Sequence, residues 1–355
     1  MSKLEKEPAI IVNDVWKIFG EQSEQAYKAI KKHKYTKAEI LSEYECVVGV
    51  AGASFEIYEG EIFCIMGLSG SGKSTLVRHI NRLLEPTAGE IIVGGEQVTE
   101  LNQDELRHLR NQQVAMVFQN FGLMPHRTVV DNVAMPLEIR GASKKQRWEE
   151  AMQALALVNL NGWEHKYAHE LSGGMQQRVG LARALATNPS ILLMDEPFSA
   201  LDPLIRRQLQ DQFMDLSAKL KKTTIFITHD LDEAIRIGNR IAIMKDGQIV
   251  QIGTPEEIVI NPADEYVANF VAGISKLNLV KAHSIMQPLA VYQHDHGPVS
   301  HTAKRVDAED DLNQLIDRSI ECNDVLVVTE NGTDVGVIQT IDLMRAIQGN
   351  RKEEG

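Results

Sequence analysis

Aromatic residues, cysteines and long apolar runs are all scarce in this chain of 355 residues. Aromatic side chains make up 5% of the sequence, so the core must be mainly aliphatic. The three cysteines, Cys46, Cys64 and Cys322, are odd in number and far apart, which argues against a disulfide framework or a cysteine metal site and favours a reducing compartment. No apolar run approaches the roughly 20 residues of a membrane-spanning helix, and the longest, 47–53, is broken by glycines.

The chain also has no excess of basic residues, because 37 Lys and Arg stand against 49 Asp and Glu, a formal net charge of −12. This balance argues against nucleic-acid binding, which requires a basic surface, and against direct docking on anionic lipid. Any attachment to a membrane should therefore run through a protein partner. Residues 1–7 lack the apolar core of a secretory signal, so we expect none. The length suggests about two domains.

Short apolar runs alternate with helical patterns over most of the chain, and 103–185 reads as mainly helical. This alternation is typical of an α/β domain with a largely parallel sheet, which we place at 1–275. The predicted strands are 9–19, 53–58, 62–66, 191–194 and 224–227, with a hairpin at 241–252.

Residues 20–46 interrupt the first strands with a lysine-rich insertion that has no strand pattern. Ala26 with Ile30, and Ala38 with Leu41, predict two short amphipathic helices in it. The insertion either forms a surface that binds a partner or is a solvent-exposed segment without such a role, and the sequence leaves both possibilities open.

The pattern of polar and apolar residues changes after 275, and residues 276–355 predict a second domain, a small β-α-β-β-α module. Its strands and helices are short, and a tight turn separates the two central strands. The predicted elements are helices at 312–319 and 343–347 and strands at 324–329 and 336–340, with a turn at Asn331-Gly332.

A glycine-rich loop at 67–74 carries the strongest functional signal. It reads Gly-Leu-Ser-Gly-Ser-Gly-Lys-Ser between a predicted buried strand and a helix, which is the pattern and the context of a phosphate-binding loop. Its glycines let successive N–H groups and the helix N-terminus face phosphate oxygens. Lys73 would supply positive charge for the β- and γ-phosphates, and the Ser74 hydroxyl suits Mg²⁺. The candidate phosphate-binding residues are Gly67, Ser69, Gly70, Ser71, Gly72, Lys73, Ser74 and Thr75.

A second signal is the pair of acidic residues that follows the predicted strand at 191–194. In an open α/β sheet, ligands bind at the carboxyl ends of the strands. Asp195 is therefore placed to hold Mg²⁺, and Glu196 is the candidate base that polarises the attacking water.

A third motif, at 171–178, reads Leu-Ser-Gly-Gly-Met-Gln-Gln-Arg and opens a predicted helix. Ser172, Gly173 and Gly174 can bind phosphate through their N–H groups and the helix dipole. Together with the two preceding motifs, it resembles the signature of the ATP-binding-cassette (ABC) ATPases, with Met175 where glutamine is commonest. The resemblance covers about residues 9–273. It implies a P-loop NTPase fold, with a RecA-like core, an antiparallel β subdomain and a helical subdomain.

The resemblance implies roles for three further residues of the ATPase site. Gln119 matches the glutamine that senses Mg²⁺ and the attacking water, and His229 matches the switch histidine that contacts the γ-phosphate. Asp202, in the segment 199–202, matches the loop that communicates across the dimer. The implied catalytic residues are thus Lys73, Gln119, Glu196 and His229, and the implied metal ligands are Ser74, Gln119 and Asp195.

Phe19 matches the aromatic residue that stacks on adenine in this family. The insertion at 20–46 separates it from the phosphate-binding loop, so a plain core phenylalanine is the alternative interpretation. In that case Tyr27 or Tyr58 would take the stacking role.

Cassettes of this family pair head to tail. The resemblance therefore implies that ATP and Mg²⁺ lie between the loop 67–74 of one chain and residues 172–174 of a second copy. One chain carries two half-sites and should be inactive alone.

The stretch 119–128 resembles the segment of bacterial ABC importers that contacts the permease, and its Phe121, Leu123 and Met124 offer an apolar groove. The insertion at 20–46, the stretch 67–83 and the C-terminal module together resemble the ATPase of glycine betaine/proline-type importers, which move quaternary ammonium compounds. This implies a permease and, indirectly, a solute-binding protein as partners at the cytoplasmic face of the bacterial inner membrane. The family carries paired cystathionine-β-synthase (CBS) motifs in its tail, whereas 276–355 accommodates about one, at 306–349.

Two other functions remain open. The ATPase of a polar amino-acid importer would share the cassette but would not normally carry the insertion. An ABC ATPase of translation or DNA repair usually has two cassettes, or a coiled-coil or zinc insertion, and this sequence shows none of these.

Overall fold

A computed structural model describes residues 7–300, 303–322 and 324–348 of the chain. The chain divides between Ile252 and Gly253 into two compact units. Most of the segment on which the expectation about a secretory signal rests, 1–6, lies outside the described residues, as does the end of the expected CBS motif, Gly349. In the described ranges, no helix combines the length and the apolar character that crossing a membrane requires.

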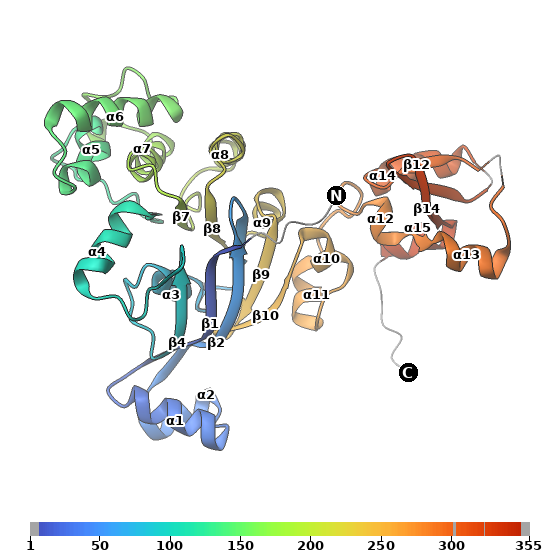
Figure 1. The fold of residues 1–355 in the computed structure, drawn as a ribbon, viewed down its shortest axis with the longest axis horizontal. Coiled ribbons are helices and arrows are strands. Elements are labelled where there is room, and N and C mark those ends of the chain that lie inside the picture. The colour runs from blue at the N-terminus through green and yellow to red at the C-terminus, as the bar shows by residue number, and fades with distance from the viewer. Residues whose placement is uncertain (1–6, 301–302, 323, 349–355) are drawn as a thin grey trace. The chain divides into compact units, whose positions relative to one another are not determined.

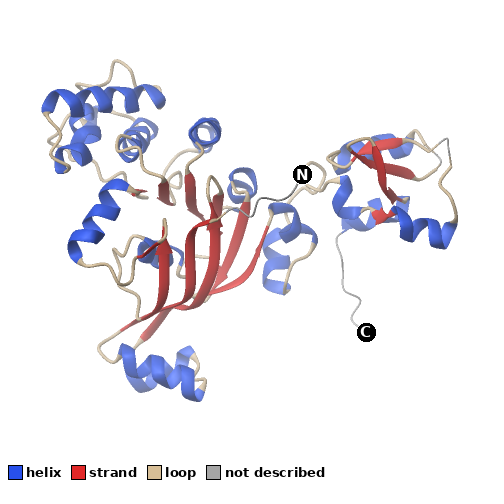
Figure 2. Cartoon of the chain, in the orientation of Figure 1, coloured by secondary structure: helices blue, strands red, loops and turns tan. Residues whose placement is uncertain are grey.

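The first unit is built around a six-stranded, largely parallel sheet (Figure 2). Its strands are β3 (Ile62–Met66), β6 (Val114–Val117), β7 (Ile191–Asp195), β8 (Thr223–Thr228), β9 (Arg240–Lys245) and β10 (Gln248–Gly253), in the spatial order β10-β9-β3-β8-β7-β6. β3 pairs in parallel with β9 and β8, and β7 pairs in parallel with β8 and β6, which confirms the expected α/β architecture. All residues of β3, β7 and β8 are buried, as in strands covered on both faces.

A second, antiparallel sheet packs against the first through a shared core. Its strands are β1 (Pro8–Phe19), β2 (Val47–Tyr58), β4 (Ala88–Val93) and β5 (Glu96–Gln97), in the order β2-β1-β4-β5. Phe55 of β2 and Phe63 of β3 stack with ring centroids 5.2 Å apart, which joins the two sheets. Leu76 and Ile80 are fully buried in the same cluster. This confirms the expected antiparallel β subdomain on a P-loop core.

Helices cover the parallel sheet and form a group of their own beyond it (Figure 1). The helices near the sheets are α3 (Lys73–Ile80), α4 (Gln103–Gln112), α8 (Pro203–Leu220) and α9 (Leu231–Ile237). The separate group, drawn in green, contains α5 (Val129–Ile139), α6 (Lys144–Leu157) and α7 (Gly173–Leu185), with a 3₁₀ turn at Ala168–Glu170. It is the expected helical subdomain.

The insertion forms two helices between β1 and β2, α1 (Ser23–His33) and α2 (Lys37–Tyr44), as expected. The prediction that Ala38 and Leu41 form the apolar face of α2 is wrong, because both residues are exposed and Ile40 is buried instead. A single isoleucine anchors this short helix, so the helical spacing of its apolar residues was a poor guide to the buried side.

The interpretation of 103–185 as mainly helical missed β6, the edge strand of the parallel sheet. β6 has only four residues, and only Val114 and Val117 are buried. An apolar run of this length does not distinguish a strand from a helical turn.

The second unit contains a small four-stranded sheet in the order β11-β14-β13-β12. Leu312, Leu315, Val328 and Ile338 belong to its own core cluster. The predicted elements around Asn331-Gly332 are present, and the unit also includes residues 253–275, which the sequence analysis assigns to the ATPase domain. Its elements are α10 (Pro255–Ile260), α11 (Glu265–Val271), α12 (Ala282–Ile285), β11 (Gln287–Pro288), α13 (Leu289–His296), β12 (Arg305–Asp307), α14 (Leu312–Ile320), β13 (Leu326–Glu330), β14 (Thr333–Ile338) and α15 (Thr340–Gln348).

Candidate functional site: a phosphate-binding loop facing two strand ends

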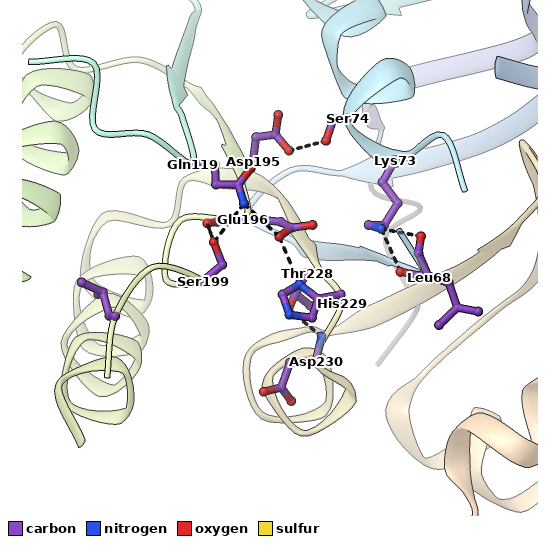
Figure 3. A network of polar contacts seen from close by, with 12 residues as sticks. Leu68, Lys73, Ser74, Gln119, Asp195, Glu196, Ser199, Thr228, His229 and Asp230 are labelled. Carbon is purple, nitrogen blue, oxygen red and sulfur yellow. Dashed lines mark hydrogen bonds and ion pairs between the residues drawn. The ribbon is translucent and has the colours of Figure 1, made fainter. Parts of the chain in front are cut away.

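The loop 67–72 connects β3 to α3 and wraps tightly around the first residue of that helix. Gly72 is the N-cap of α3 at φ +100°, and a Cβ there would lie 2.4 Å from the Gly49 carbonyl oxygen. Only glycine fits this left-handed, crowded position. The Lys73 ammonium is buried and donates to the carbonyl oxygens of Gly67 (2.8 Å) and Leu68 (3.0 Å), as Figure 3 shows. The loop thus holds a positive charge at the N-terminus of a helix, an arrangement that suits a phosphate.

Burial lowers the pKa of the Lys73 ammonium, while the nearby Glu196 and Asp195 carboxylates oppose that shift. The two carboxylates follow one another at the end of β7, beside the loop. These two negative groups favour the charged form of the buried lysine.

The Ser74 hydroxyl donates to Asp195 Oδ1 at 2.7 Å (Figure 3). Ser74 lies in the first turn of α3, and Asp195 is the last residue of β7, so the contact joins two segments far apart in the sequence. Arg78, one turn further along α3, contacts Asp195 Oδ2 at 3.3 Å. The structure thus brings together the two sequence-predicted oxygen ligands, and adds an arginine that the sequence analysis did not single out.

Glu196, directly after β7, is the centre of a second polar cluster (Figure 3). Its Oε2 lies 3.0 Å from Nδ1 of His229, which follows β8, and 3.4 Å from the Gln119 amide nitrogen. The same amide nitrogen lies 3.3 Å from the Ser199 hydroxyl, which donates to the Glu196 carbonyl oxygen at 3.0 Å. The structure therefore brings Gln119, Glu196 and His229 together in one cluster. Glu196 adopts φ +45°, a strained conformation for a non-glycine residue of the kind that concentrates at functional sites.

An open cavity of about 720 Å³ extends from the phosphate-binding loop to the Glu196 carboxylate. This volume is typical of a small-molecule site, roughly 300–1,000 Å³. It is lined by Phe19, Val47, Val48, Gly49, Leu68, Ser69, Gly70, Gly72, Lys73, Ser74, Thr75, Gln119, Glu196 and His229.

Phe19, at the end of β1, forms one wall of the cavity and is 40% exposed, unlike a core phenylalanine. A Cβ on Gly49 would lie 2.7 Å from the Phe19 ring, so the glycine lets the ring lie close against β2. Tyr27 and Tyr58, the alternatives for a stacking role, do not line this cavity. Gly49 was missed from the sequence, although a glycine inside a strand is a recognised sign of close approach.

The signature residues Ser172, Gly173 and Gly174 do not line the cavity of their own chain. Ser172 is the N-cap of α7 and is exposed together with Gly173. Asp202 is likewise outside the cavity and caps α8, where its carboxylate accepts from the Ile205 N–H at 3.1 Å. These predicted nucleotide-binding positions are therefore separated from the others within one chain.

The segment 119–128 is held by two buried polar side chains. Asn132 accepts from the Met124 N–H at 2.7 Å and donates to the carbonyl oxygens of Met124, Arg127 and Thr128. Arg183 donates to the carbonyl oxygen of Gly122 at 2.6 Å. The segment is thus a fixed surface feature between the sheet and the helical subdomain.

A groove of about 350 Å³ lies at this segment, but its lining differs from the expectation. Phe118 and Gly122 line it, whereas Phe121, Leu123 and Met124 do not. The alternation of apolar residues along an irregular loop did not indicate which side chains face the groove. The remaining walls come from the residues that follow α3 and from α4, β6, α5 and α7, chiefly Leu83, Met116, Met135, Pro136 and Ala184.

Comparisons with known proteins agree with this geometry. The model of the family described as ABC transporter matches residues 50–199, and that of an AAA domain described as a putative AbiEii toxin of a type IV toxin–antitoxin system matches 164–235. The glycine betaine transport ATP-binding protein OpuAA of Bacillus subtilis is 55% identical, over 84% of this chain and 71% of that protein. The glycine betaine/carnitine transport ATP-binding protein GbuA of Listeria monocytogenes is 48% identical, over 96% and 83%.

Solved structures show the same likeness over about two thirds of the chain. The dimeric structure of the bacterial ABC transporter cassette MJ0796 superposes with a TM-score of 0.59 at 33% identity, covering 69% of this chain and 98% of that cassette. A phosphate-binding loop that faces two strand-end carboxylates therefore occurs here with high identity to transport ATP-binding proteins along most of the chain. The chain belongs to the ABC transporter family, among the ATP-binding proteins of glycine betaine-type transport systems.

Proposed function

We propose that this chain hydrolyses ATP to power the import of glycine betaine or a related quaternary ammonium compound. The observation that carries the ATPase part is the contact of Glu196 with His229, at the cavity of the phosphate-binding loop. The solute class comes from the relatives, whose names include glycine betaine, proline betaine, carnitine and choline.

In this proposal, Glu196 accepts a proton from the water that attacks the γ-phosphorus. The new bond forms between the water oxygen and phosphorus, and the bond from phosphorus to the oxygen that bridges it to the β-phosphate breaks, so ADP leaves. His229 and Gln119 hold Glu196 and the γ-phosphate region in position, and Lys73 balances the phosphate charge. Such reactions depend mainly on positioning and electrostatic stabilisation.

The residues at the end of β7 fit a Mg²⁺ ion bound together with ATP. Ser74 and Asp195 offer hard oxygen donors 2.7 Å apart, and Gln119 adds an amide. Among the described residues, no group of three or more His, Cys, Asp or Glu could hold a metal. The ion would take the Asp195 carboxylate, the Ser74 hydroxyl and the Gln119 amide oxygen from the protein, and the rest of its ligands from phosphate and water.

The active form in this proposal is a head-to-tail pair of cassettes. Ser172, Gly173 and Gly174 are displaced from their own chain's cavity, and residues 172–173 are exposed at the start of α7, free to complete a neighbour's site. Asp202 caps α8 and would lie at the same interface. The similarity to a dimeric cassette structure supports this arrangement.

The same proposal includes a permease and a solute-binding protein as partners. The segment Gln119–Thr128 and its groove would receive a cytoplasmic helix of an integral-membrane permease, which would hold the chain at the cytoplasmic face of the bacterial inner membrane. A solute-binding protein would act indirectly, through the permease. The acidic net charge gives no support for nucleic-acid binding.

Residues 276–355 are, in this proposal, a CBS-like regulatory module after an ATPase domain of 1–275. The sheet and core of the second unit are compatible with it, because β12, α14, β13, β14 and α15 give the β-α-β-β-α order.

Reconstitution tests this proposal. The chain would be purified with the permease it co-isolates with, placed in liposomes with ATP inside, and assayed for uptake of labelled glycine betaine, carnitine and choline. ATP-dependent uptake of one of these, abolished by Glu196→Gln, is the expected result. Uptake of a polar amino acid instead would favour the alternative importer, and recovery without any permease would overturn the transport function.

A further inference from the structure

The ATPase mechanism assigns no role to the insertion at 20–46. The insertion packs against the antiparallel sheet, because Ala26, Ala29 and Ile40 are buried in a cluster with residues of β1 and β2. The strand ends on either side of it, Phe19 and 47–49, line the nucleotide cavity. The insertion is therefore continuous with two strand ends that line the cavity, although none of its own residues is among the lining residues.

Lys37, the first residue of α2, reaches from the insertion to the turn between β9 and β10. Its backbone is fixed by a capping box, in which the Thr36 N–H donates to Glu39 Oε2 at 2.6 Å and Thr36 Oγ accepts from the Glu39 N–H at 3.3 Å. The Lys37 ammonium donates a hydrogen bond to the carbonyl oxygen of Asp246.

The same turn is bonded to the phosphate-binding loop. The Gly247 N–H donates to the carbonyl oxygen of Ser71 at 2.9 Å, and the Gly247 carbonyl oxygen accepts from the Ala51 N–H at 2.8 Å. A Cβ on Gly247 would lie 2.8 Å from the Gly49 carbonyl oxygen, so the turn has little room to move against β2. If the turn moved, the hydrogen bond from Gly247 would therefore move the backbone of Ser71, two residues before Lys73.

We propose that Lys37 is a positioning residue for nucleotide binding: it holds the 246–247 turn, which in turn fixes the backbone of the phosphate-binding loop at Ser71. The inserted helices then set the affinity of the chain for ATP without touching the nucleotide. This inference requires only that the chain binds ATP, and it is independent of the permease and the solute.

Calorimetric titration of the full chain with ATP tests the proposal, using Lys37→Met, which keeps the aliphatic stem and removes the donor. We expect its Kd for ATP to rise about three- to tenfold, the loss of one charge-assisted hydrogen bond. Lys37→Arg, which retains a donor, and Lys32→Met, at an exposed lysine of α1, should stay within about twofold of the original chain. In steady-state assays of the transporter, KM for ATP should rise while kcat stays nearly constant.

Hydrogen exchange gives a second, activity-free readout. The amides of Ser71–Lys73 should exchange faster in Lys37→Met than in Lys32→Met. An unchanged Kd together with unchanged exchange at these amides would overturn the proposal, as would an equal effect of Lys32→Met. If Lys37→Met does not fold, Lys37→Gln replaces it in the same titration. Failure of the original chain to bind ATP would instead contradict the proposed ATPase function.

Discussion

Glu196 Oε2 lies 3.0 Å from Nδ1 of His229, and each residue comes directly after one of two neighbouring parallel strands, β7 and β8. The register that pairs Asp195 with Ile227 is what brings the two side chains to the same edge of the sheet. The contact gives the carboxylate an oriented partner in the cavity that the phosphate-binding loop also lines.

Replacing this carboxylate should separate binding from chemistry. We expect Glu196→Gln to bind ATP with nearly unchanged Kd, because the phosphate-binding loop is intact, and to lose about a hundredfold or more in ATP turnover, as for a lost general base. Phosphate release and equilibrium ATP binding measure the two effects. Glu149→Gln, at an exposed position of α6, is the matched control, and full turnover in Glu196→Gln would remove Glu196 from the mechanism.

Asp195→Asn should weaken the response to Mg²⁺. The substitution removes a carboxylate that both Ser74 and Arg78 contact, so the proposed ion would lose its anionic ligand. We expect the Mg²⁺ concentration for half-maximal ATPase activity to rise about tenfold or more. Asp232→Asn, on the exposed side of α9, should leave the titration unchanged; an identical Mg²⁺ dependence in both variants would place the ion elsewhere.

Phe19→Ala should reduce affinity for ATP without reducing the affinity for inorganic triphosphate. The ring lies in the cavity wall, and aromatic stacking on a base contributes about 1–3 kcal/mol, so we expect Kd for ATP to rise about tenfold. Phe19→Tyr keeps the ring and should bind as the original chain does. If Phe19→Ala binds ATP normally, the adenine does not lie on this wall.

The buried carboxyl of Glu233 should make the free energy of unfolding depend on pH. Burial raises the pKa of this α9 carboxyl above its usual value, although hydrogen bonds from Thr228 and Gln210 oppose the shift. An acid with a raised pKa binds its proton more tightly in the folded state, so its contribution to the free energy of unfolding is complete at acidic pH and is lost as the pH rises through the raised pKa.

Glu233→Gln stays neutral at every pH and should not lose that contribution. The Tm of Glu233→Gln minus that of the original chain should therefore increase between about pH 5 and pH 8, measured by scanning calorimetry. Glu149→Gln should show no such trend. A constant difference would mean that Glu233 titrates at an ordinary pKa in the folded chain.

The amino-acid sequence by itself determined the local chemistry. The order Gly-Leu-Ser-Gly-Ser-Gly-Lys-Ser after a buried strand fixes a phosphate-binding loop, because few other sequences allow that backbone and place a lysine at the helix start. The acidic pair after 191–194 and the histidine after 224–227 likewise lie at strand ends, where the parallel sheet gathers them.

Other features depended on contacts that no local pattern encodes. The burial of Ile40 rather than Leu41, the short strand β6 and the lining of the groove at 119–128 were missed because each depends on which neighbour packs against a few residues. The link from Lys37 through Gly247 to Ser71 joins three segments far apart in the chain. Sequence fixes which residues can do the chemistry, whereas only the packing of the two sheets decides which distant backbone atoms meet and hold the loop.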